Sequence, residues 1–563
     1  MAEVDQELLA SVFEERAEYL SKTELSAWTI ITARDREIIA KLTGPGAKLL
    51  IGPRGCGKST LLRHSYFQIN EKKKDLAVYV NYSRSLALEP MFHKTANALQ
   101  LFRQWVLVKI AVGVGNTILE EGLELPPTLV PIYQKGRDFI RELEAGLQVQ
   151  LSGDYLTPST LLSLLESWAA RLDRKRLILL LDDAAHAFSP EQQREFFEVF
   201  RELRSRIVSA KAAVYPGITS YSPYFHVGHE AEVVQAWYKP EDEDYLYTMR
   251  EIADRRLPNR HKRALRGRED LVDYVALACF GIPRGFLVML SQLLGIEEGE
   301  PSATPTRLSA ERAVSDHADS VKNVFTSLAS KLSRYSRFVE VGNELALAMT
   351  QSLQAFNVNK GIARKAVTVA FPVPIGPEVN RMLQMLEYAG IVRDAGSVSR
   401  GEKGVFNRYI LHYGFVITGN ALSLGKSFSL VDVVAALTQR NAHAFVRVQA
   451  KNLLGLDYAN RCTLDLAPCE NCGAPRPSED ALFCMRCGQP LKTASVYDEL
   501  IKAPIDRLPL TKNKIQGLKK YTGIRTVNDV LLDEDYTQIR SVPSVGPIWS
   551  ARIRRYAEEF VSV

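Results

Sequence analysis

One nine-residue segment, GPRGCGKST at Gly52–Thr60, constrains the fold more than any other part of the chain. It fits the pattern GxxxxGK(S/T), and it stands between a short apolar run, AKLLIG, and an amphipathic stretch, TLLRHSYFQI. A strand, a glycine-rich turn and a helix in this order present backbone N–H groups at a helix N-terminus, where they bind phosphate oxygens. The alternative is a glycine-rich turn formed by chance, which the two flanks disfavour.

Each residue type in this segment suits phosphate chemistry. Glycines at 52, 55 and 57 permit the tight turn. Lys58 is expected to reach the β- and γ-phosphates, and the Ser59 hydroxyl to bind Mg²⁺. The sequence therefore predicts a Mg-ATP site. Its nucleotide-binding residues are Gly52, Pro53, Arg54, Gly55, Cys56, Gly57, Lys58, Ser59 and Thr60.

Short apolar runs alternate with amphipathic stretches from about residue 48 to residue 295. Four of these runs are typical of buried strands: Ala47–Gly52, Leu76–Tyr82, Arg176–Asp183 and Ala212–Ile218. This order predicts an α/β unit, in which a parallel sheet is covered by helices.

Two carboxylates, Asp182 and Asp183, end the third of these runs. In a phosphate-loop protein, the acid at this place holds the Mg²⁺ shell, so we expect Asp182 to act as a magnesium ligand together with Ser59. Asp183 occupies the place of a base that polarises the attacking water. The alternative is a solvated strand end with no catalytic role.

Four cysteines form two CxxC pairs separated by eleven residues: Cys469, Cys472, Cys484 and Cys487. This spacing lets two tight turns present four thiolates tetrahedrally to one Zn²⁺. Gly473 and Gly488 follow the second cysteine of each pair and suit such turns. A structural zinc ribbon is the prediction, and reduced cysteines without metal are the alternative.

Composition excludes few functions. A net charge of +6 on 563 residues permits nucleic-acid binding but does not argue for it. No apolar run approaches the roughly 18 residues that a membrane helix needs, so we expect no membrane partner. The first twenty residues lack the basic-then-apolar order of a secretory signal. We therefore expect the protein in the cytoplasm.

A helix followed by a β-hairpin is predicted further along the chain. The helix covers Pro377–Gly390, and the runs IVRD and VFNRYIL flank a Gly/Ser/Arg-rich tip at Arg400–Lys403. This order is typical of a winged helix.

The order of motifs resembles AAA+ and STAND ATPases, and among them the origin-recognition-like branch, over about residues 20–305. The resemblance rests on the phosphate loop, LLLDDA, a fourth strand ending near Thr219 and Ser220, and GIPRG at Gly281–Gly285. It implies that Arg284 begins a lid helix and contacts the γ-phosphate. It also implies that Thr219 or Ser220 replaces the usual sensor Asn. Asp183 stands where many members carry Glu, which implies slow hydrolysis.

The stretch VPSVGPIWSARI, within Pro504–Val563, is similar to the C-terminal domain of the bacterial RNA polymerase alpha subunit and to helix-hairpin-helix domains of DNA repair. The resemblance implies contact with a DNA phosphate. Ser544 and Ile548 depart from that pattern, so protein docking is the alternative. The positive charges that support a DNA contact are Lys519, Lys520, Arg525 and Arg552.

Length predicts several domains. The units expected are a P-loop ATPase core (1–230), a helical lid (231–305), a helical linker with the winged helix (306–445), a zinc ribbon (446–493) and a helix-hairpin-helix segment (494–563). Basic residues also gather at Arg255–Arg268, at the wing tip and at Arg201, Arg204 and Arg206. They fit a solvated surface, a DNA backbone or a subunit interface, where one would act as an arginine finger.

The leading hypothesis is an ATPase switch that hydrolyses ATP slowly and engages DNA or a DNA-bound partner. Resemblance alone adds a bacterial antiviral or mobile-element setting. One rival is an ATP-bound scaffold that recruits a protein effector without hydrolysis. The other is a homo-oligomeric replication or transcription loading factor.

Overall fold

The computed structural model describes residues 17–18, 20–94, 97–147, 149, 156–184, 189–296, 304–425, 427–439, 444–476, 481, 483–491, 496–533, 535–543 and 545–561. A five-stranded parallel sheet forms the N-terminal half, with the order β2-β3-β4-β1-β5. Its strands are β1 (Lys48–Ile51), β2 (Leu76–Asn81), β3 (Leu177–Asp182), β4 (Val208–Val214) and β5 (Glu232–Gln235).

Helices cover both faces of this sheet because its strands are apolar on both sides. Along β3, Ile178 and Leu180 pack with α3 and α4, whereas Leu177, Leu179 and Leu181 pack with α6, α8 and α9. These helices and their neighbours are α2 (Lys22–Trp28), α3 (Ala33–Thr43), α4 (Lys58–Lys72), η1 (Ser83–Leu88), α5 (Glu89–Lys94), α6 (Ala98–Glu120), α7 (Val130–Glu144), α8 (Pro158–Arg171) and α9 (Pro190–Glu202). The α/β prediction for this half is confirmed.

Two strands differ from their predicted extents. β4 begins at Val208, four residues before the predicted start, and ends at Val214 rather than at residue 218. The early part was hidden by Lys211, which is fully buried although it is charged. Its ammonium group is satisfied because it donates to the carbonyl oxygens of Gly44 and Gly46. The short edge strand β5 was not predicted.

Helices α10 (Tyr245–Arg256), α11 (Asn259–Leu265), α12 (Glu269–Ala278) and α13 (Pro283–Leu293) follow β5. The next part holds a four-stranded sheet of order β7-β8-β6-β9. Its elements are α14 (Arg307–Lys331), η3 (Ser333–Tyr335), α15 (Ser336–Asn357), η4 (Ile362–Arg364), β6 (Thr368–Pro372), α16 (Pro377–Tyr388), β7 (Val392–Ser399), η5 (Gly401–Lys403), β8 (Val405–Leu411), α17 (Tyr413–Thr418), α18 (Leu430–Thr438), β9 (Val446–Arg447), α19 (Ala450–Leu454) and α20 (Tyr458–Arg461). The helix α16 and the antiparallel hairpin β7–β8 lie where the sequence places a helix and hairpin. The winged-helix interpretation stays a prediction.

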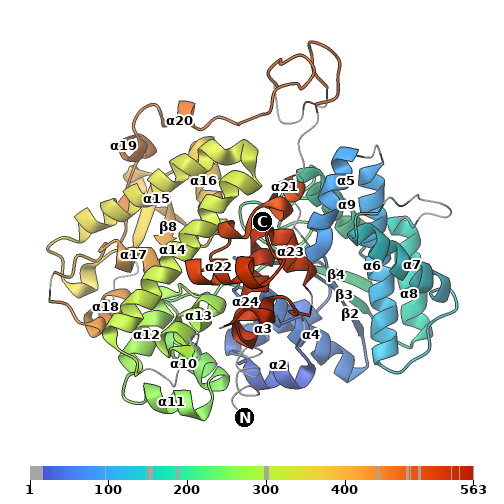
Figure 1. Cartoon of the computed structure of the whole chain (residues 1–563), viewed down its shortest axis with the longest axis horizontal. Helices are drawn as coiled ribbons and strands as arrows, with labels where there is room; N and C mark the ends of the chain where they lie inside the picture. The colour runs from blue at the N-terminus through green and yellow to red at the C-terminus, as the bar shows by residue number, and fades with distance from the viewer. Residues whose placement is uncertain are drawn as a thin grey trace.

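The C-terminal segment, residues 496–561, lies across the middle of the molecule, where Figure 1 draws it in red. It contacts the N-terminal half through α21 and α5, and the central helices through α21 and α14. Its elements are α21 (Val496–Lys502), η6 (Ile505–Arg507), α22 (Lys512–Tyr521), α23 (Val527–Leu532), η7 (Ile539–Ser541) and α24 (Pro547–Val561). The C-terminal segment is therefore packed against both the N-terminal half and the central helices.

Among the described residues, α6 is the one helix that is long and apolar enough to cross a membrane. Arg103, Gln104 and Lys109 interrupt its apolar sequence, which is why no such run was recognised. The structure buries 78% of its most apolar window inside the protein. Core helices pass the same test, so α6 is weak evidence for a membrane span.

We predict that Gly217→Ala destabilises the contact between the loop after β4 and α16. Gly217 has φ +77°, and an added Cβ would lie 2.1 Å from the main-chain oxygen of Gln384. Gly228→Ala is the control, because Gly228 has φ +91° but no atom within 4 Å of that Cβ. Urea unfolding should show Gly217→Ala less stable than Gly228→Ala by about 1–3 kcal/mol. Equal stabilities would contradict this packing.

Candidate nucleotide-binding site

The glycine-rich segment forms a tight turn between β1 and α4. Gly55 has φ +78° and Gly57 has φ +100°, a region that other residues rarely adopt. Gly57 is the N-cap of α4, so the first N–H groups of this helix lie at the loop. At Gly52, an added Cβ would lie 2.5 Å from Sγ of Cys56. The strand, turn and helix of a phosphate-binding loop are thus present as the sequence predicts.

The ammonium group of Lys58 is buried against this loop. Its Nζ donates to the carbonyl oxygens of Gly52, at 2.6 Å, and Pro53, at 3.1 Å. It also lies 4.0 Å from the centroid of the Tyr215 ring, a cation–π contact. Burial lowers the pKa of Lys58 from its ordinary value, whereas Asp183 and Asp182 act in the opposite direction. Lys58 is therefore held at the loop and faces both acids.

Asp182 ends β3 beside the loop and is 1% exposed. Tyr79 donates its hydroxyl to Oδ2 of Asp182 at 2.7 Å, and Ser59 also forms a side-chain hydrogen bond with this carboxylate. Burial and the nearby charge of Asp183 raise the pKa of Asp182 to about 6. A hydroxyl and a carboxylate in contact supply the hard oxygen ligands that Mg²⁺ prefers, so these residues fit the predicted magnesium site.

Asp183 is held by a residue that the sequence analysis missed. The hydroxyl of Tyr215 donates to Oδ1 of Asp183 at 2.8 Å, and Asp183 itself has φ +51°. Tyr215 directly follows β4, so the misplaced end of that strand concealed it. The hydroxyl of Thr219 instead donates to the carbonyl oxygen of Tyr215, and the backbone N–H of Ser220 donates to Oε1 of Gln193 on α9. Tyr215 is the polar residue from β4 that contacts the acid pair.

Two arginines belong to this region: Arg54, within the loop, and Arg284, which follows it far along the chain. Arg284, near the start of α13, donates its backbone N–H to the carbonyl oxygen of Gly55 at 3.3 Å. A Cβ added to Gly55 would lie 2.9 Å from Cβ of Arg284, so α13 touches the loop. Arg54 forms a hydrogen bond with Tyr388 at the end of α16. Burial lowers the pKa of Arg54, but Tyr388 and other acidic groups outweigh this and raise it.

A cavity of about 1110 Å³ adjoins the loop, between the carboxyl edge of the first sheet and the β7–β8 hairpin. Its wall includes Gly52 and Tyr215 on one side and Glu387 and Arg393 on the other. Burial is the main cause that raises the pKa of Glu387 to about 7, although the N–H of Asp394 donates to its carboxylate. Arg393 forms an ion pair with Glu241 across the two parts.

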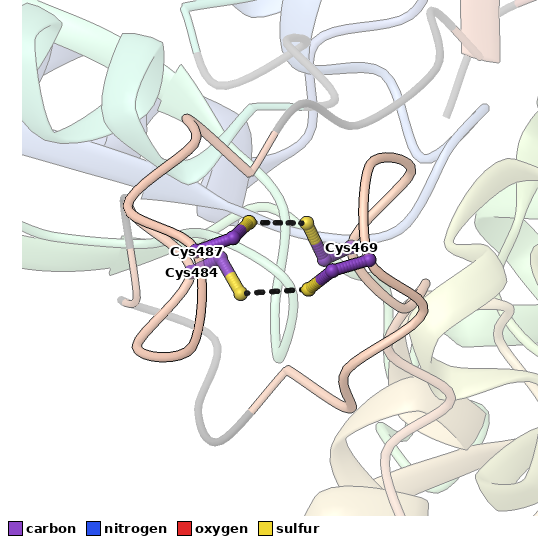
Figure 2. Close-up of side chains that lie close together, drawn as sticks. Cys469, Cys484 and Cys487 are labelled. Atoms are coloured by element: carbon purple, nitrogen blue, oxygen red, sulfur yellow. Dashed lines mark hydrogen bonds between the residues drawn. The ribbon is translucent and has the colours of Figure 1, made fainter.

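The four predicted zinc ligands converge in a second site, shown in Figure 2. Their Sγ atoms all lie within 4.8 Å of one another, with Cys469 3.5 Å from Cys487 and Cys472 3.5 Å from Cys484. Gly473 and Gly488 have positive φ, and each donates its N–H to the carbonyl oxygen of the first cysteine in its turn. Tetrahedral zinc with Zn–S bonds of about 2.3 Å places sulfurs about 3.8 Å apart, so the cluster fits zinc.

The predicted DNA-contact residues differ in exposure and in the contacts that they make within the protein. Arg552 is 2% exposed and stacks on Trp549, so it is not a surface charge and that prediction is wrong. Lys519 pairs with Asp506 at 2.6 Å, and Arg525 donates to the main-chain oxygens of Thr522 and Ile524. The wing tip at residues 399–405 is exposed. Ser544 lies outside the described residues, as does the side chain of Ile548.

The long basic runs make many internal contacts. In the run Arg255–Arg268, Arg256 stacks on Trp28 and Arg268 donates to the main-chain oxygen of Pro305. On α9, Arg201 pairs with Glu198 at 2.9 Å. Arg204 pairs with Glu230 at 2.6 Å. Part of each run therefore stabilises the fold.

Loop, acid pair and parallel sheet together define a phosphate-loop α/β protein. No family model matches the chain. No curated protein matches it either. Three solved structures are similar in part: a Walker-type ATPase of Pyrococcus abyssi (17% identity, TM-score 0.39, covering 70% of this chain and 96% of that one), Cdc6p of Pyrobaculum aerophilum (13%, 0.32, 75% and 97%) and the Aeropyrum pernix Orc1 protein in complex with DNA (16%, 0.29, 69% and 91%). The functional interpretation rests on the geometry of the site.

We predict that Glu387→Gln stabilises the protein at alkaline pH. The pKa of Glu387 is about 7 in the folded chain and 4.5 in the reference state, so the folded state binds more protons between these values and stability falls as pH rises through them. The neutral variant avoids this loss and should gain about 1–3 kcal/mol at pH 8, but little at pH 4. Urea unfolding at both pH values measures the gain. Glu402→Gln, at the exposed wing tip, is the control, and a gain independent of pH would contradict the assignment.

Proposed function

We propose that the protein is a nucleotide-controlled switch of the AAA+ type that binds Mg-ATP at Gly52–Thr60 and hydrolyses it slowly. The observation that carries this proposal is the convergence of Lys58, Ser59, Asp182 and Asp183 at one loop. Lys58 and Ser59 begin α4, and Asp182 and Asp183 lie at the end of β3. Each has the charge or oxygen atom that phosphoryl transfer requires.

In this proposal, Lys58 and Arg284 bind the terminal phosphates, and Ser59 and Asp182 hold Mg²⁺. The metal would neutralise charge that develops on the phosphate oxygens. Asp183 would orient and polarise the attacking water. The hydrogen bond from Tyr215 occupies one oxygen of Asp183, and an aspartate reaches less far than a glutamate. Both features support slow turnover.

The finer part of the proposal is that ATP controls binding to DNA or to a DNA-bound partner. It is supported by the exposed wing tip with Arg400 and Lys403, and by Lys520 and Arg525 in the C-terminal segment. Phosphate contacts of this kind give affinity without base specificity. The cytoplasm is the proposed location. A homo-oligomeric state and a protein effector remain predictions from the sequence.

The test compares the wild type with Lys58→Ala and Asp183→Asn. Lys58→Ala loses charge-assisted hydrogen bonds to phosphate, so ATP affinity should fall about 10- to 100-fold. Asp183→Asn should keep ATP binding but lose turnover by about 10²–10⁴-fold, because a general base is removed. Calorimetry and phosphate release measure the two effects, and thermal unfolding confirms that both variants fold.

The DNA part is measured with the same variants and a labelled duplex. Fluorescence anisotropy should show duplex binding that needs ATP, weakens steeply with salt and is lost in Lys58→Ala. ATP binding without turnover or duplex binding would instead favour the non-hydrolysing scaffold. Failure of the wild type to bind ATP would overturn the proposal as a whole.

We also propose that the four-cysteine cluster holds one structural Zn²⁺. Four thiolates fill the tetrahedral coordination of zinc, so such a site has no open position for catalysis. The two turns belong to a short segment between β9 and α21 with little core of its own, and a metal would fix their relative position.

Elemental analysis should find one zinc per chain in the wild type. Cys472→Ser and Cys484→Ser should lose it, because each removes a ligand. Cys462→Ser is the control, since Cys462 is a free buried cysteine outside the cluster, and it should keep the metal. Zinc retained at full stoichiometry after loss of either ligand, or absent from the wild type, would refute this site.

A further inference from the structure

The last helix of the described chain contacts Arg284, the arginine that touches the phosphate loop. Glu559, near the end of α24, accepts a hydrogen bond at Oε1 from Nη1 of Arg284 at 3.1 Å. Its main-chain oxygen accepts from Nζ of Lys331, on α14, at 3.0 Å. Arg555, one turn earlier on α24, brings its Nε to 4.0 Å from the same Oε1. The end of α24 is thus held by two cations that belong to other parts of the fold.

These cations belong to the surroundings of the candidate nucleotide site. Arg284 touches the loop through its backbone and its Cβ. Lys331 is 6% exposed, and burial together with the positive charge of Arg54 lowers its pKa to about 7. The negative charge of Glu559 also contributes to the raised pKa of Arg54. The carboxylate of Glu559 therefore interacts with Arg284, which touches the loop, and with the charges of Arg54, which is in the loop, and of Lys331.

Such a cluster attracts anions, and a guanidinium binds a carboxylate or a phosphate with the same donors. We propose that the carboxylate of Glu559 and the terminal phosphate of ATP compete for Arg284, so that ATP binding weakens the docking of α24. This inference rests on the proposed function, because it needs ATP at the loop. It assigns the C-terminal segment as the part of the protein that responds to the γ-phosphate.

Competition for one arginine makes the two events reciprocal. If ATP lowers the affinity of α24 for the site, an intact Glu559 lowers the affinity for ATP by the same factor. ADP lacks the γ-phosphate and should not compete. The pair is partly exposed, with 41% of the Arg284 side chain and 32% of the Glu559 side chain accessible, so exchange of partners needs no opening of the core.

A second contact holds the other end of the C-terminal segment. The buried carboxylate of Glu89, on α5, accepts from the N–H groups of Val496 and Tyr497 at 3.3 Å each. This contact lies on α21 and does not involve the phosphate loop. Release of α24 from Arg284 would therefore leave the segment attached through α21. Because α24 also packs against α21 and α23, the expected change is a loosening of α24 at its contact with Arg284 rather than separation of the whole segment.

The variant Glu559→Gln tests the competition. It should bind ATP about fivefold to tenfold more tightly than the wild type, with unchanged affinity for ADP. Glu558→Gln is the matched control, since Glu558 is its neighbour on α24 and pairs with Arg554 at 3.1 Å instead of Arg284. Calorimetry with each nucleotide and Mg²⁺ measures both affinities. An unchanged ATP affinity in Glu559→Gln, or an equal increase in Glu558→Gln, would overturn the inference.

Hydrogen exchange of the wild-type chain gives a second test that needs no variant. Residues 547–561 should exchange faster with a non-hydrolysable ATP analogue than with ADP, whereas α21 should stay protected. Equal exchange with the two nucleotides would contradict the competition. Loss of ATP binding by the wild type would instead refute the proposed function, and is recognised because Lys58→Ala then binds no more weakly than the wild type.

Discussion

The buried ammonium group of Lys58 is the interaction on which the arrangement around the phosphate loop depends. A charge removed from water must be compensated, and here the carbonyl oxygens of the loop, the ring of Tyr215 and the acid pair all contribute. This requirement brings together the ends of β1, β3 and β4. It also explains why the residue after β4 is aromatic: its ring faces Lys58, and its hydroxyl binds Asp183.

The parts of the site that follow each other in the chain could be predicted from the sequence. The conformation of Gly52–Thr60 follows from neighbouring residues, because the glycine spacing and the flanking strand and helix are local features of the sequence. The two CxxC pairs could be predicted for the same reason, because their spacing is also a local feature of the sequence. Tyr215 was not predicted because its role depends on where β4 ends, and the apolar run continues past Val214 to residue 218. Glu559 could not be found at all, since 275 positions separate it from Arg284.

The basic residues show why charge counts alone predict function poorly. Arg552 is buried on Trp549, Arg256 stacks on Trp28 and Lys211 caps two glycine carbonyls, so all three serve the fold. Arginine is suited to this use because its planar group stacks on rings and bonds in several directions. Positive charge that could meet a nucleic acid can be counted only after these internal contacts are subtracted.

The packing of the C-terminal segment brings an acidic residue of α24 to Arg284, which touches the phosphate loop. An acidic residue on α24 suits Arg284, because a carboxylate compensates the charge of a partly buried guanidinium. The same charge makes the contact conditional, since a phosphate offers Arg284 more negative charge than a carboxylate does. Docking of α24 and binding of the nucleotide then both require the guanidinium of Arg284. The surface that α24 offers to a partner therefore depends on which nucleotide is bound at the phosphate loop.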